Sequence, residues 1–133
     1  MWASVKGPSP AGLLLRLTLA GLIAAHGWTR VIVGGVVPFG EWLDSQSIPF
    51  GVVTAAAITG IEIAGSLLLA LRRMVIPLCL LLSAIYVTGI ALVHAREGWF
   101  VVGHGRNGAE YSVLIIVCLA SIALMERQAT RTK

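Results

Sequence analysis

The sequence feature that most constrains the fold is the apolar run at 51–71, GVVTAAAITGIEIAGSLLLAL, with one charged side chain, Glu62, near its centre. A run of this length crosses a bilayer as a single α-helix. A carboxylate at the middle of a membrane helix costs about 2.5–3.5 kcal/mol on insertion scales. We therefore expect Glu62 to be protonated, paired with a cation, or turned toward a polar cavity inside a helix bundle.

Three further apolar segments accompany this run. Hydrophobic residues make up 57% of the chain and charged residues 12%, whereas soluble domains carry about 25% charged residues. The four segments lie at about 11–33, 51–71, 74–95 and 109–126, and each is long enough to span a hydrocarbon core of about 30 Å. Because short connections favour antiparallel neighbours, we predict an all-α integral membrane protein. Its single domain, 1–133, is an antiparallel up-down four-helix transmembrane bundle.

The basic residues predict the orientation of this bundle. With four spans, seven fall on one side and three on the other: Lys6, Arg16, Arg72, Arg73, Arg127, Arg131 and Lys133 against Arg30, Arg96 and Arg106. The positive-inside rule then places both termini in the cytoplasm and the 34–50 and 96–107 connections outside. The formal net charge of +4 is explained by topology, so we expect membrane lipid and no nucleic acid as a partner.

Six polar side chains fall between the midplane and the outer boundary when depth is counted from the centre of each segment. They are His26, Arg30, Glu62, Tyr86, His94 and Glu110. Ionisable groups inside membranes usually face the bundle interior and mark ion, proton or ligand sites. We predict that these residues form a ligand-binding site between the helices, in the outer half of the membrane and open to the outer side or to the outer leaflet, with Glu62 and Tyr86 closing it below.

Each of these residues also has a structural alternative. The Glu62 carboxyl can serve structure alone by hydrogen-bonding to the first helix, and Tyr86 can be a core residue with a satisfied hydroxyl. His94 taken singly is more often hydrogen-bonded or solvated than a ligand, and Arg30 can be an ordinary interfacial charge. Arg16, alone in the inner half, is expected to snorkel to the inner headgroups or to pair locally.

Glycine and proline mark the 34–50 connection as irregular. Its aromatic residues Phe39, Trp42 and Phe50 suit the membrane interface, which makes this connection a candidate lid over the mouth of the bundle. On the second span Ala56, Gly60 and Ala64 recur on the face opposite Glu62. Small residues at this spacing let helices approach closely, either within the chain or in a homo-oligomer.

Metal and flavin motifs are missing from the sequence. Cys79 and Cys118 are the only cysteines, and they form no CxxC pair and no metal-like Cys/His spacing. We therefore predict no metal site, and no catalytic residue is assigned. The chain has no electron carrier of its own, so any electrons would come from a partner protein.

The chain resembles the DoxX family of small four-helix membrane proteins over roughly residues 13–126. The matching pieces, in order, are Arg16 with His26-Gly27, then Glu62, Gly65 and Leu67–Leu69 followed by Arg72-Arg73, then His94 with Gly98-Trp99-Phe100, and finally Asn107, Gly108 and Glu110. The glycine-rich C-terminal signature of many relatives is replaced after Met125 by a basic tail. The resemblance implies a multi-pass protein of the bacterial inner membrane that is associated with redox chemistry. Its relatives include a subunit of a thiosulfate:quinone oxidoreductase and a component of a mycobacterial membrane oxidoreductase complex.

Three functions follow as hypotheses, because one fold hosts many activities. The first is a quinone-linked redox subunit of a larger membrane complex, with the quinone headgroup bound by the polar residues. The second is a non-enzymatic accessory or assembly factor, whose polar cluster specifies helix register or binds a partner's transmembrane segment. The third is a small-molecule or proton transporter that works as an oligomer.

Overall fold

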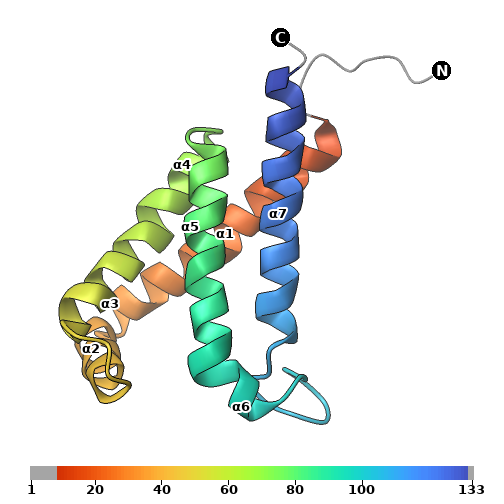
Figure 1. Ribbon diagram of the computed structural model, residues 1–133. Helices are drawn as coiled ribbons and strands as arrows, with labels where there is room; N and C mark the ends of the chain where they lie inside the picture. The colour runs from red at the N-terminus through yellow and green to blue at the C-terminus, as the bar shows by residue number, and fades with distance from the viewer. Residues whose placement is uncertain (1–8, 132–133) are drawn as a thin grey trace.

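The computed structural model describes residues 9–131, so Lys6 and Lys133 of the predicted charge pattern lie outside the described residues. Within that range the protein contains helices and no strand (Figure 1). Four helical spans are long and apolar enough to cross a membrane: Pro10–Ile32, Gly51–Ala70, Val75–Glu97 and Glu110–Arg131. The predicted all-α membrane fold is confirmed. The last span continues past the predicted end at 126, because the basic tail remains helical.

The spans are subdivided by two π-helical turns. The first span is α1 (Pro10–Ile32), and a short helix α2 (Val36–Ser45) follows it. The second span consists of α3 (Gly51–Gly60), η1 (Ile61–Gly65) and α4 (Ser66–Ala70). The third consists of α5 (Val75–Gly89), η2 (Ile90–His94) and α6 (Ala95–Glu97), and the fourth is α7 (Glu110–Arg131).

All four spans run between two ends of the bundle. The start of α1, the turn from α4 to α5 and the end of α7 lie at one end, which we call the terminal end (Figure 1). The other end carries α2, α6 and the 98–109 connection, and we call it the loop end. The described basic residues divide between the ends as the sequence pattern predicts. The assignment of the loop end to the outside of the cell remains a prediction.

Helix α1 is the centre of the packing. It contacts α3, η1 and α4 on one side and α7 on the other, while α5 packs along α7. Ile23, Leu69, Leu82 and Leu119 are fully buried where these helices meet. In a bilayer such contacts stabilise the bundle through van der Waals packing, because lipid is as apolar as the side chains.

Gly27 allows the closest approach of α1 to the second span. A Cβ atom at this residue would lie 2.7 Å from the Ile63 side chain and 3.2 Å from the Thr59 carbonyl oxygen. Only glycine fits this crossing without moving the helices apart. The contact brings the last turns of α1 alongside η1, where Glu62 lies.

The prediction of an irregular 34–50 connection is wrong for its central part, which folds into α2. Pro38 is the third residue of this helix, and the amides of a first helical turn have no intrahelical partner to lose. A Cβ at Gly40 would lie 2.4 Å from the Val52 Cα, so α2 packs directly on α3. Asp44 then accepts a hydrogen bond from the Gly51 amide at 2.9 Å, which joins the two helices.

The small residues of the second span face away from this packing. Ala56, Gly60 and Ala64 are exposed in the single chain, and a Cβ at Gly60 would meet no atom within 4 Å. The predicted opposition between these residues and buried Glu62 is therefore confirmed. Intrachain packing, one of the two alternatives for them, is not found.

Candidate functional site

The two π-helical turns each carry one of the predicted site residues. Glu62 is the second residue of η1, and His94 is the last residue of η2. A π turn inserts one extra residue into the helix and is frequently found at functional sites. Glycines flank these turns at 60, 65 and 89. The apolar periodicity gave no sign of them, because the flanking residues read as continuous helix.

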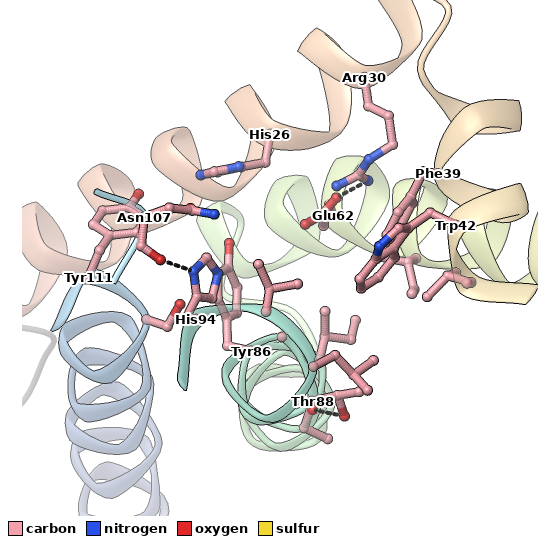
Figure 2. A pocket seen from close by; sticks show the side chains of 18 of the residues that line it. His26, Arg30, Phe39, Trp42, Glu62, Tyr86, Thr88, His94, Asn107 and Tyr111 are labelled. Atoms are coloured by element: carbon pink, nitrogen blue, oxygen red, sulfur yellow. Dashed lines mark hydrogen bonds and ion pairs between the residues drawn. The ribbon is translucent and has the colours of Figure 1, made fainter. Parts of the chain in front are cut away.

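A cavity of about 540 Å³ lies between α1, α2, the second and third spans and the start of α7. This volume falls in the usual range for ligand pockets, roughly 300–1,000 Å³. Five of the six residues predicted from depth line it: His26, Arg30, Glu62, Tyr86 and His94 (Figure 2). The fold therefore gathers polar groups from three different spans around one space.

One side of the cavity is built on an ion pair. Arg30 Nη1 lies 2.5 Å from Glu62 Oε2, and the two side chains are 19% and 5% exposed. The same nitrogen donates to Thr59 Oγ1 at 2.9 Å, and the guanidinium carbon lies 4.7 Å from the centre of the Phe39 ring. The expectation that Glu62 faces the bundle interior within reach of the first helix is confirmed. Its charge is compensated inside the protein, as a membrane-embedded carboxylate requires.

The other side of the cavity gathers imidazole and phenol groups. His94 Nδ1 lies 2.7 Å from the Asn107 carbonyl oxygen, and because a carbonyl only accepts, this nitrogen must carry the proton. When His94 is neutral, its Nε2 is left as an acceptor. The His26 ring lies 6.1 Å from the Tyr111 ring, centre to centre. The Tyr86 hydroxyl is buried and has no hydrogen-bond partner among the described residues.

Glu110 is the predicted site residue that the structure places elsewhere. It opens α7, and its Oε1 accepts a hydrogen bond from the Val101 amide at 3.0 Å. Side chains in a first helical turn point back toward the helix N-terminus, so this carboxylate reaches into the preceding connection and not into the cavity. Counting residues from the centre of the segment gives a depth for Glu110 in the membrane, but it does not give the direction of the side chain.

Several lining residues were absent from the sequence-based site. Phe39 and Trp42 come from α2 and stack on each other with ring centres 6.2 Å apart. The sequence marked these rings as interfacial, and the position of α2 turns them toward the cavity (Figure 2). Tyr111 was passed over beside Glu110, although its neighbour Ser112 begins the buried face of α7.

Comparison with known proteins identifies the family. A family model described as DoxX matches residues 11–95, from the first turn of α1 to just past η2. The chain belongs to the DoxX family. No curated protein and no solved structure matches it. The matched DoxX region includes every cavity residue of the first three spans, whereas the resemblance at Gly98, Asn107 and Glu110 lies beyond it.

Away from the cavity, the DoxX chain holds a second buried cation. Arg16 is 8% exposed, and its Nε has no hydrogen-bond partner in the described part of the chain. The expected local ion pair is not found among residues 9–131, and snorkelling to the inner headgroups stays a prediction. At the terminal end Arg72 Nε instead pairs with Glu126 at 2.8 Å. Among residues 9–131 no group of three or more His, Cys, Asp or Glu side chains could hold a metal ion.

Proposed function

We propose that the cavity binds the headgroup of a quinone, and that this multi-pass membrane protein acts as a redox-associated subunit in the bacterial inner membrane. The observation that carries the proposal is the ion pair in the cavity wall. Of the Asp, Glu, Lys and Arg side chains in the described part of the chain, Arg30 and Glu62 are the two that line the cavity, and their opposite charges neutralise each other. A cavity with this balance favours a neutral ligand over an ion, because an ion would enter a low-dielectric space without a counter-charge.

The distribution of hydrogen-bonding groups supports the same ligand class. A quinone ring is flat and neutral and presents two carbonyl acceptors. Arg30 offers donors on one side of the cavity, and the Tyr86 hydroxyl lacks an acceptor on the other. Phe39 and Trp42, which stack on each other, supply aromatic faces near Arg30 (Figure 2). His94 Nε2 can take up a proton when it is neutral, which suits a quinol hydroxyl.

The redox association rests on the resemblance to DoxX relatives that work with quinone-linked enzymes. Because the sequence offers no electron carrier, we propose that electrons reach the ligand through a partner protein in a larger membrane complex or in a homo-oligomer. The role of this chain is then to bind and orient the headgroup in an environment without bulk water.

An accessory or assembly role is the second candidate. It is favoured by the hydrogen bond that Arg30 donates to Glu62 Oε2, because this carboxylate already has a partner without a ligand. If the Glu62 carboxylate only fixes how α1 packs on η1, the cavity has no role in ligand binding. Ligand binding therefore separates the two candidates, whereas stability alone does not.

The test is a fluorescence titration of the protein in lipid nanodiscs. Replacing Trp2, Trp28 and Trp99 by Phe leaves Trp42 in the cavity wall as the reporter among the four tryptophans. A water-soluble dimethoxy benzoquinone without a tail should quench Trp42 with saturation. In the same background Tyr86→Phe should weaken binding about tenfold, the usual effect of losing one good hydrogen bond.

The matched control is Glu126→Gln, which removes a carboxylate from an ion pair at the terminal end. It should bind the benzoquinone like the parent protein, while Glu62→Gln should bind it more weakly. Linear, unsaturable quenching in the parent protein would reject the quinone proposal. Equal effects of Glu62→Gln and Glu126→Gln would favour the accessory role.

A further inference from the structure

Two anchored segments, α2 and the 98–109 connection, lie over the cavity at the loop end. Helix α2 packs backbone to backbone on α3 at Gly40 and is tied to it by Asp44. The 98–109 connection is held at its base, where the Gly108, Ala109 and Glu110 amides donate to the carbonyls of residues 98–100 at 3.0–3.1 Å. The Glu110 carboxylate adds the bond to Val101. The 34–50 connection, the candidate lid, and the 98–109 connection are therefore both anchored.

The wall between α3 and α5 has no such fastening. The second and third spans meet at the 71–74 turn, where α4 and α5 adjoin it, and they diverge toward the loop end (Figure 1). As a result α3 and α5 have almost no direct contact with each other. Ile58 of α3 and Leu81, Ala84 and Thr88 of α5 line the cavity. The three α5 residues are also exposed on the outer surface of the bundle. These three residues, like His26 and Asn107, both line the cavity and are exposed. The unfastened gap between α3 and α5 is therefore one of the places where the cavity reaches the surface.

The chemistry of this opening matches an aliphatic chain. Ile58, Leu81 and Ala84 have apolar side chains, and the Thr88 hydroxyl is satisfied by the Ala84 carbonyl oxygen at 2.9 Å. The opening faces the region where lipid tails lie, at the depth of the second and third spans. A helix of another chain needs a diameter of about 10–12 Å. A cavity of about 540 Å³ accommodates a headgroup and part of a chain but not a helix.

We infer that the ligand is an amphiphile whose aliphatic tail leaves the cavity between α3 and α5 into the leaflet at the loop end. The ligand reaches the site from the lipid by the same gap, not from water through the loops. This inference rests on the proposed function and adds to it the substrate class, a quinone with an isoprenoid or alkyl tail.

The experiment compares two quinones and two phenylalanine variants of the protein that keeps Trp42 as its reporter, all in nanodiscs. One quinone is the tail-less dimethoxy benzoquinone and the other carries a decyl tail, with concentrations expressed per lipid. Ala84→Phe narrows the gap without adding a second indole to the Trp42 background. Ala120→Phe is the control, because Ala120 is exposed on α7 and is not among the cavity residues.

Ala84→Phe should weaken binding of the tailed quinone about tenfold, a typical effect of overfilling a packed space. Binding of the tail-less quinone should change less than about twofold, and Ala120→Phe should affect neither ligand. An equal loss for both quinones, or no loss for the tailed one, would overturn the gap as the tail's exit while leaving the quinone proposal standing. Binding of neither quinone to the parent protein would overturn both. A dimer in native mass spectrometry that Ala84→Phe dissociates would place a second chain in the gap and also overturn the inference.

Discussion

Replacing Arg30 by Met should destabilise the protein strongly, because it leaves the Glu62 carboxylate buried without a counter-charge. The Glu62 side chain is 5% exposed, and its carboxylate forms an ion pair with the Arg30 guanidinium. Removing one partner of a buried pair typically costs about 3–5 kcal/mol. Replacing both residues, as Arg30→Met with Glu62→Met, should recover most of this loss, since two apolar side chains leave no buried charge.

The Arg72–Glu126 pair provides the matched comparison. Its side chains are 32% and 21% exposed, so solvent screens the charges. When one partner is removed, water can hydrate the charge that remains. Breaking that pair with Arg72→Met should cost about 1 kcal/mol or less. The contrast between the two sites follows from burial, because both are single Arg–Glu contacts, one between α1 and η1 and the other between the 71–74 turn and α7.

The free energy of unfolding would be measured by SDS titration in mixed micelles, followed by the loss of helical circular dichroism. The parent protein, Arg30→Met, Glu62→Met and the double variant form a double-mutant cycle, whose coupling energy for Arg30 and Glu62 should exceed about 2 kcal/mol. A cost of Arg30→Met no larger than that of Arg72→Met would refute the reasoning. So would a double variant as unstable as Arg30→Met alone.

Three further outcomes are expected. Tyr86→Phe should leave the apo protein as stable or more stable, by up to about 1 kcal/mol in SDS titration, because the buried hydroxyl has no partner to lose; a clear loss of stability would reveal a hidden partner. Gly27→Ala should destabilise by about 1–3 kcal/mol in the same assay, because its Cβ would press on Ile63; an unchanged midpoint would contradict the tight crossing. Glu110→Gln should speed hydrogen exchange at the Val101 amide, as a charged acceptor becomes neutral, while leaving quinone affinity within about twofold; a larger loss of affinity would return Glu110 to the site.

The sequence predicted the four spans and the depth at which the polar residues lie, because both can be read from positions along the chain. Apolar length sets the four spans, and the cost of a buried carboxylate singled out Glu62. Counting residues along antiparallel helices placed His26, Tyr86 and His94 between the midplane and the outer boundary, each at its own depth. Depth alone, however, does not fix the direction of a side chain, which is why Glu110 was grouped with residues from which it points away.

Features that depend on packing between segments were not predictable in this way. Helix α2 forms because Gly40 fits against Val52, a contact between residues whose proximity only the fold provides. The π turns at Glu62 and His94 leave no compositional mark. The burial of Arg16 likewise follows from the neighbours that α1 acquires in the bundle, and nothing in the structure shows a partner for its Nε among the described residues.

The most direct test of the account is native mass spectrometry of the protein released from nanodiscs made with its own host membranes. The account predicts a bound neutral species with the mass of a tailed quinone, retained by Glu126→Gln and reduced in Tyr86→Phe and Ala84→Phe. A protein that carries phospholipid alone, or a quinone signal that is the same in all of these variants, would contradict it.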